Sequence, residues 1–142
     1  MRPFFSLAIP DGILRELREH ARRESPLECC GILAGDRGCV ARMFPIRNDA
    51  VSPVEYFTNA RDLLNTQRAI READLTELAL YHSHPAGEAI PSRTDLERNT
   101  WGESVAHVII GMDSIRAWWL GPDRFEELPI VGRTESCSPH SS

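Results

Sequence analysis

Residues 75–85 read Leu-Thr-Glu-Leu-Ala-Leu-Tyr-His-Ser-His-Pro. The short apolar run that ends at Tyr81 is typical of a strand buried in the centre of a sheet. Pro85 ends this strand because proline cannot donate to a strand ladder. Side chains two positions apart on a strand point to the same face, so His82 and His84 leave the strand end together. The stretch therefore predicts a central strand that presents two imidazoles to one point.

The flanking sequence predicts strands and helices on both sides of that strand. Apolar residues recur at helical spacing after Pro10 and after Asn59, and Ser92 begins a further helix to about Trp101. Short apolar runs bounded by turn residues predict strands at 4–9, 29–34, 39–46, 106–111, 115–120 and 125–130, with a brief extended piece at 55–57. The expected fold class is therefore α/β, of mixed α+β type, built on a mixed sheet.

Length and composition indicate one globular domain. The chain has 142 residues, of which 42% are hydrophobic and 26% are charged, as is usual for such a domain. We expect the domain to cover residues 1–132 and a Ser-rich, disordered tail to follow at 133–142. A net charge of -5 without any Lys/Arg-rich block disfavours nucleic acid as a partner.

The sequence also predicts the compartment and the state of the cysteines. No stretch approaches the length of an apolar membrane-spanning helix, and the N-terminal residues make a poor signal peptide, so we expect a cytoplasmic protein without a membrane partner. Cys29, Cys30, Cys39 and Cys137 form no C-x-x-C pair, which favours reduced thiols over a disulfide framework. Cys29 and Cys30 are expected to be small buried strand residues rather than metal ligands.

Three larger side chains fit structural roles. His107 begins an apolar run and is expected to be packed in the interior. Trp118 and Trp119 are neighbours on an expected strand, so their indoles point to opposite faces. We expect one indole in the core and the other on the far face, where it could mark a contact surface.

A third ligand candidate follows the histidine pair. Asp95 falls in the first turn of the helix expected from Ser92, close enough for its carboxylate to swing back over the strand end. Two imidazoles and one carboxylate suit tetrahedral zinc and leave the fourth position open for water, as in catalytic zinc sites. The spacing therefore predicts one zinc ion per chain, held by His82, His84 and Asp95.

Glu28 and Ser92 are the candidate catalytic residues. An open zinc site lowers the pKa of its water to about 7 and polarises a carbonyl, but hydrolysis also needs a proton acceptor. Glu28 begins an expected strand, and we place it beside that water, to take its proton and pass it to the leaving amine. Ser92 could donate a hydrogen bond to the oxygen that becomes negative in the tetrahedral intermediate.

Each of these residues also has an ordinary structural interpretation. Ser92 and Asp95 have the spacing of a helix capping box. A single strand-end histidine is more often exposed or hydrogen-bonded than a ligand, and Glu28 could be a solvated charge before a strand. The histidine pair, its spacing to Asp95 and the upstream glutamate favour the metal site when taken together, and Ser92 could serve both as cap and in catalysis.

The pattern resembles the JAMM (MPN+) metalloprotease family, whose motif is an upstream glutamate, H-[S/T]-H-P and then S-x-x-D. The sequences His-Ser-His-Pro at 82–85 and Ser-Arg-Thr-Asp at 92–95 reproduce the family's spacing, and residues 26–35 resemble the segment that carries the glutamate. The resemblance spans residues 7–120. It implies that His82, His84 and Asp95 bind zinc, that Glu28 is the general base, and that Ser92 orients the water and the oxyanion.

The resemblance also implies a fold and excludes other chemistry. It implies a curved mixed sheet wrapped by helices, the JAB/MPN fold, which is related to the cytidine deaminase architecture. Deaminase chemistry needs H-x-E and a downstream P-C-x-x-C, and both are absent, as is the H-E-x-x-H of other zinc peptidases. The stretch from Asp95 to His107 is too short for the insert that grips ubiquitin in eukaryotic relatives.

The likeness is greatest to stand-alone bacterial Mec-type hydrolases, through Tyr-His-Ser-His at 81–84 and Pro-Ser-Arg-Thr-Asp at 91–95. Those enzymes cut after the C-terminal Gly-Gly of ubiquitin-like sulfur-carrier proteins and release cysteine or another amino acid. The resemblance implies a peptidase or isopeptidase whose partner is such a carrier, with the extended tail along an exposed strand edge and its glycines in a slot at the zinc. Two alternatives are a non-catalytic MPN-type interaction scaffold and a DNA-repair relative, the latter disfavoured by the acidic balance.

Overall fold

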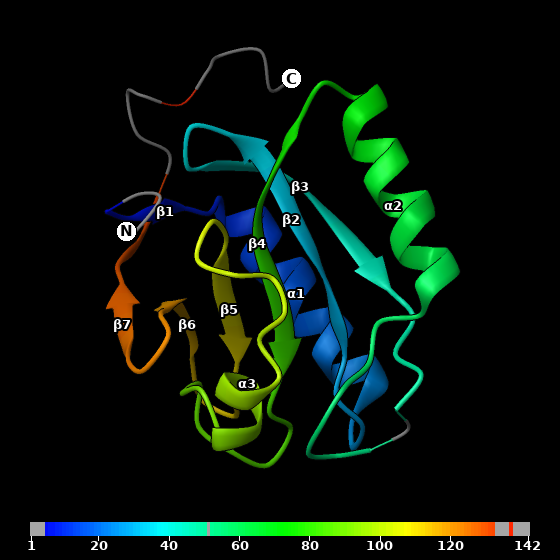
Figure 1. Ribbon diagram of the computed structural model, residues 1–142, viewed down its shortest axis with the longest axis vertical. Coiled ribbons are helices and arrows are strands. Elements are labelled where there is room, and N and C mark those ends of the chain that lie inside the picture. Colours follow the sequence, from blue (N-terminus) through cyan, green and yellow to red (C-terminus); the bar gives the residue numbers. More distant parts are fainter. Residues whose placement is uncertain (1–4, 51, 133–136, 138–142) are drawn as a thin grey trace.

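The computed structural model describes residues 5–50, 52–132 and 137, which form one mixed eight-stranded sheet with helices on both faces (Figure 1). The strand order is β7-β6-β5-β4-β2-β3-β1-β8. The mixed α/β class is therefore confirmed. The strands are β1 (Leu7–Ala8), β2 (Cys30–Asp36), β3 (Cys39–Ile46), β4 (Thr76–Ser83), β5 (Ala106–Ile110), β6 (Ile115–Leu120), β7 (Phe125–Leu128) and β8 (Ile130–Val131); the helices are α1 (Asp11–Glu24), α2 (Ala60–Glu72) and α3 (Arg93–Glu97).

Strand β4 occupies the centre of the sheet, as its apolar run predicts. It pairs antiparallel with β2 and parallel with β5. All its residues from Leu78 to Ser83 are buried. Because β4 is paired on both sides, the strand that carries the histidines offers no free edge, and an exposed strand edge for a substrate tail stays a prediction for another part of the sheet.

The helices divide between the two faces of the sheet. Helix α1 covers one face, where Ile13 and Leu17 join a core cluster that includes Tyr81 of β4. Helix α2 covers the opposite face through Ile70, and Leu96 of α3 packs on a third cluster there. Figure 1 shows α3 in front of the end of β4 and α1 behind the sheet. The face of α2 and α3 is the one that bears the candidate site.

Local hydrogen bonds explain where the helices begin and end. The Asn59 side chain accepts from the Asp62 amide and caps α2, as the sequence predicts. Helix α3 ends at Glu97 rather than near Trp101, so that expected boundary is wrong. The Trp101 amide donates to the Asn99 side chain at 3.2 Å, and such a bond offers the backbone an alternative to the helix.

The expected strand at 125–130 is two strands. Strand β7 pairs with β6, whereas β8 pairs with β1. Pro129 lies between them, and its carbonyl accepts from the Leu7 amide at 3.0 Å. Proline has no N–H to continue the first ladder, so the chain changes partner at this residue.

Other expectations have mixed outcomes. The strand expected at 4–9 covers only Leu7–Ala8, with Phe4 outside the described residues. Trp118 and Trp119 lie on opposite faces, but both are buried, so the outward contact surface is wrong. His107 is packed in the interior as expected. None of the helices among the described residues is long and apolar enough to cross a membrane.

The cysteines differ from expectation at one pair. Cys39 at the start of β3 forms a disulfide with Cys137, with 5.4 Å between their Cα atoms, whereas reduced thiols were expected. The pairing could not be inferred from spacing because the two residues are 98 positions apart. Cys29 and Cys30 are free and buried, as expected. The rest of the expected tail, at 133–136 and 138–142, lies outside the described residues.

We expect Cys137→Ser to lower the free energy of unfolding by about 2–4 kcal/mol, because the disulfide closes a loop of 98 residues and restricts the unfolded chain. Urea denaturation of the variant and of the wild type under oxidising conditions measures the difference. Reduced wild-type protein serves as the control and should match the variant. A variant as stable as the oxidised wild type would contradict the expectation.

Candidate metal centre

The two histidines converge because of their place on β4. His82 lies inside the strand, paired with Cys30 and Ile109 in the flanking strands. His84 follows the strand end, and its amide donates to the Ile110 carbonyl at 2.9 Å. The two side chains share a face, and their Nε2 atoms lie 3.2 Å apart. His82 is 1% exposed and the His84 side chain 14%, so both imidazoles lie mostly inside the fold.

Asp95 reaches the same point from the first turn of α3. The Ser92 side chain accepts from the Asp95 amide at 3.1 Å, and Asp95 Oδ2 accepts from the Ser92 amide at 2.9 Å. The same Oδ2 lies 3.2 Å from His82 Nε2 and 3.1 Å from His84 Nε2. The capping box and the approach to the histidines therefore coexist, and the structural interpretation of this motif does not compete with the metal site.

The three donor atoms fit a zinc ion. They form a triangle with sides of 3.1–3.2 Å. Ligands at 2.0–2.1 Å in tetrahedral geometry are about 3.3–3.4 Å apart, so the triangle needs little change to hold the ion. His84 Nδ1 also lies 2.8 Å from the Glu88 carbonyl, the kind of outer partner that fixes a ligating imidazole. The corresponding Nδ1 of His82 is buried without a partner.

The electrostatics of this triangle favour a cation. Burial would raise the pKa of Asp95, but hydrogen bonds from His82 and His84 outweigh it and hold that pKa well below the ordinary value. Burial lowers the pKa of His84, and its bonds to Asp95 and the Glu88 carbonyl reverse the shift, so the net change is upward. The carboxylate is thus ionised and draws positive charge to the point where the imidazoles meet.

Glu28 lies just before β2 and is buried, with 2% of its surface exposed. Its Oε1 has no hydrogen-bond partner. Burial raises the pKa of this carboxyl to about 8, against the opposing effect of His84 nearby. The interpretation of Glu28 as a solvated charge is therefore wrong. A buried carboxyl with one unpaired oxygen, close enough to His84 and Asp95 for their charges to affect its pKa, has the properties of a proton acceptor.

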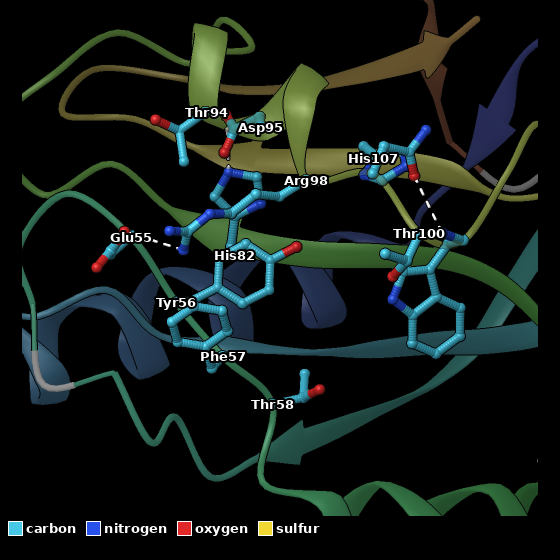
Figure 2. A pocket seen from close by; sticks show the side chains of 12 residues that line it. Glu55, Tyr56, Phe57, Thr58, His82, Thr94, Asp95, Arg98, Thr100 and His107 are labelled. Carbon is cyan, nitrogen blue, oxygen red and sulfur yellow. Dashed lines mark hydrogen bonds and ion pairs between the residues drawn. The ribbon is translucent and has the colours of Figure 1, made fainter. Parts of the chain in front are cut away.

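A pocket of about 390 Å³ opens beside His82 and Asp95 (Figure 2). The Tyr56 ring stacks on the His82 ring, with centroids 4.7 Å apart and planes at 22°. Across the mouth, Arg98 forms an ion pair with Glu55 at 3.0 Å. The lining residues are Glu55, Tyr56, Phe57, Thr58, His82, Thr94, Asp95, Arg98, Asn99, Thr100, Trp101 and His107.

This pocket does not follow from the sequence. Residues 55–57 are expected only as an extended piece, and the structure has an isolated bridge between Asn48 and Thr58 there. The available signal was the Tyr-Phe pair at 56–57, two aromatic residues in a stretch otherwise typical of a turn. Because a loop has no hydrophobic period, nothing in the sequence indicated which way these rings face.

In metal-free protein we expect Glu28→Gln to raise the free energy of unfolding, by an amount that grows with pH. The folded-state pKa of about 8 lies above the ordinary glutamate value of 4.5, which applies to the unfolded chain. Below pH 4.5, Glu28 is protonated in both the folded and the unfolded wild type. Between the two values the unfolded chain loses a proton that the folded chain keeps, so the wild type loses stability as pH rises through that window while glutamine stays neutral.

The increase in the free energy of unfolding caused by Glu28→Gln should reach about 2–4 kcal/mol near pH 8. A pKa that moves by one pH unit corresponds to about 1.4 kcal/mol before solvent screening. Urea unfolding midpoints of both proteins with a chelator, at pH 5 and pH 8, measure it. An equal gap at the two pH values would contradict the expectation.

Comparison with known proteins adds an independent finding. The family described as prokaryotic homologs of the JAB domain matches residues 10–121. The chain is 41% identical over 115 residues to a probable TtuB-protein conjugate cleaving protease of Thermus thermophilus, covering 80% of this chain and 76% of that protein. It is 38% identical over 108 residues to the CysO-cysteine peptidase of Mycobacterium tuberculosis, covering 75% and 73%.

Solved structures agree with the expected fold. A protein from Desulfitobacterium hafniense matches with a TM-score of 0.85 and 26% identity, over 96% of this chain and 98% of that one. A JAB1/MPN domain protein from Archaeoglobus fulgidus matches with a TM-score of 0.59 and 20% identity, over 88% and 99%. The expected JAB/MPN fold is therefore confirmed.

Proposed function

We propose, from the premise that this chain belongs to the family of prokaryotic homologs of the JAB domain, that it is a zinc-dependent peptidase or isopeptidase acting after the Gly-Gly tail of a ubiquitin-like or sulfur-carrier protein. The observation that carries the proposal is the triangle of His82, His84 and Asp95 donor atoms, 3.1–3.2 Å on each side. One zinc ion per chain would be held there. When bound, zinc supplies a Lewis acid that acidifies water and polarises a carbonyl.

Two residues of the chain would handle the proton and the developing charge. Glu28 would accept a proton from the attacking water and deliver it to the leaving amine, for which its buried, unpaired oxygen is suited. Ser92 Oγ already accepts from the Asp95 amide, and its O–H is the donor that would stabilise the oxyanion. Asp95 is held by its own helix and keeps the histidines in place.

The relatives support the substrate class. One is named a TtuB-protein conjugate cleaving protease and another a CysO-cysteine peptidase, so both act at a bond between one protein and a second group. We propose the same class for this chain, with cysteine or another amino acid as one leaving group. The compartment we propose is the cytoplasm.

We infer which side of the scissile bond the pocket receives. Glu28 would hand its proton to the leaving amine, so the leaving group would lie on the side of Glu28. The pocket borders His82 and Asp95, and Glu28 does not line it. The carrier tail would therefore enter through the pocket.

The test is hydrolysis of purified carrier proteins that bear Gly-Gly followed by one extra amino acid, and of carriers joined through Gly-Gly to a lysine side chain. Mass spectrometry should show loss of the group after the second glycine. Carriers with Ala-Ala in place of Gly-Gly, and enzyme treated with a chelator, serve as controls and should show no loss. Intact substrates throughout, or cleavage that survives the chelator, would overturn the proposal.

The interaction scaffold is the less favoured alternative. A scaffold has no need of three metal donors within hydrogen-bond distance, nor of an unpaired carboxyl with 2% exposure beside them. A buried polar group without a hydrogen-bond partner lowers the stability of the fold. Proteins retain such destabilising groups mainly at functional sites. Elemental analysis of the purified protein separates the two, since the proposed enzyme should contain one zinc per chain.

A further inference from the structure

Asn48 lies directly beyond β3 and makes three short hydrogen bonds with its side chain. Its Nδ2 donates to the Glu28 carbonyl at 2.8 Å. Its Oδ1 accepts from the amides of Ala50 at 2.8 Å and of Phe57 at 2.9 Å. One half-buried side chain thus joins the segment that carries the proposed base to the segment that forms a wall of the pocket.

The main chain of Glu28 depends on these bonds because the residue lies outside the sheet ladder. Strand β2 begins at Cys30. The Glu28 amide donates to the Ser52 carbonyl at 3.1 Å, and its carbonyl accepts from Asn48. Both of these main-chain bonds of Glu28 therefore join it to Asn48 and Ser52. Backbone bonds from Asp49 to Phe57 and from Asn59 to Arg47, both 2.8 Å, hold this part of the chain together.

The same part of the chain reaches the other side of the site. Tyr56 stacks on the ring of His82, and Phe57 lies under the Arg98 guanidinium, 4.7 Å from it. Figure 2 shows Tyr56 on one side of His82 and Asp95 on the other. The Phe57 amide that Asn48 accepts from is adjacent to Tyr56 in the chain. Asn48 therefore does not itself line the pocket, but it holds the main chain of Glu28 and of Phe57, which lines it.

We propose that Asn48 is a positioning residue for hydrolysis, acting mainly through Glu28 and secondarily through Tyr56. The inference rests on the proposed function, in which Glu28 is the base. Asparagine is suited to this place because it donates and accepts at once, whereas aspartate only accepts and leucine does neither. Displacing a reacting group by about 1 Å can cost about 10²-fold in rate, so a base whose main-chain carbonyl is held by the Asn48 side chain is sensitive to that side chain.

Two substitutions of Asn48 separate its bond to Glu28 from its bonds to the Ala50 and Phe57 amides. Asn48→Asp keeps both acceptor bonds and removes the donor to Glu28, whereas Asn48→Leu removes all three with little change in shape. We expect Asn48→Asp to lower kcat about 10–100-fold with KM unchanged, and Asn48→Leu also to raise KM. Zinc content should equal that of the wild type in both. The matched control is Asn65→Asp, which makes the same chemical change at an exposed position of α2, and its kcat should equal that of the wild type.

A double-mutant comparison excludes a merely structural role. In a Glu28→Gln background, Asn48→Asp should change the residual rate less than twofold, because its effect passes through the missing carboxylate. The visible spectrum of cobalt-substituted Asn48→Asp should also move toward that of cobalt-substituted Glu28→Gln. An equal loss in both backgrounds, or an unchanged kcat and spectrum in Asn48→Asp, would overturn the inference.

The outcomes distinguish this inference from the proposed function. If Glu28→Gln is inactive but Asn48→Asp turns over at the wild-type rate, only the role of Asn48 fails. If Glu28→Gln itself retains full activity, the proposed base is wrong and the inference falls with it.

Discussion

Glu28→Gln should leave only a small residual turnover while leaving zinc bound. Glutamine has the shape of glutamate but cannot accept the proton, and loss of a general base costs about 10²–10⁴-fold in rate. The side chain is not among the three atoms that form the metal triangle, so elemental analysis should still find one zinc per chain. Substrate affinity should change little, since Glu28 does not line the pocket.

The measurement is kcat on a Gly-Gly carrier substrate, beside zinc content, for wild type and variant. Glu24→Gln, at the end of α1, makes the same chemical change outside the site and should retain full activity. Wild-type turnover in Glu28→Gln would remove the general base from the mechanism. Loss of zinc in this variant would instead place Glu28 among the groups that hold the ion.

His84→Ala should lose both the zinc and the activity. It removes one corner of the triangle and also the bond to the Glu88 carbonyl. Loss of an outer partner alone costs about 10–100-fold in metal affinity, and loss of a ligand should cost more. We choose His84 over His82 because its side chain is 14% exposed, so truncation leaves a smaller void in the core.

Zinc per chain after dialysis, together with turnover, tests this expectation. Ser92→Ala is the contrasting variant: it should keep its zinc and lose about 10²–10³-fold in kcat, the usual effect of removing an oxyanion donor. Loss of the cap also costs about 1 kcal/mol of stability, so the folded fraction must be measured. Stoichiometric zinc in His84→Ala would show that the triangle is not the metal site.

The sequence could predict those parts of the fold in which residues recur at the spacing of a strand or a helix. The apolar run before His82 predicts a central strand, and a two-residue spacing predicts that His82 and His84 share a face. Both predictions are confirmed by the pairing of β4 and the 3.2 Å between the ring nitrogens. The Ser92-x-x-Asp95 spacing likewise predicts a local capping box, which is present.

The rest depended on contacts without a local pattern. The stacking of Tyr56 on His82 and the three bonds of Asn48 arise from a loop, where side-chain direction has no period. The Cys39–Cys137 pairing depends on where distant segments meet. Helix α3 ends at Glu97, and beyond it the Asn99 side chain accepts a hydrogen bond from the Trp101 amide. Helical spacing alone does not indicate such a side-chain bond.

The capping box on α3 implies that the chain can fold before the metal ion binds. Asp95 is fixed by Ser92 through two bonds of its own helix, at 2.9 and 3.1 Å, and the main chain of His82 and His84 is held by hydrogen bonds to the neighbouring strands. The chain's own hydrogen bonds thus hold the backbone of each ligand, in contrast to zinc fingers, which are unfolded without metal. Apoprotein should therefore accumulate as a finished fold, and the supply of zinc in the cell would decide how much of it is active.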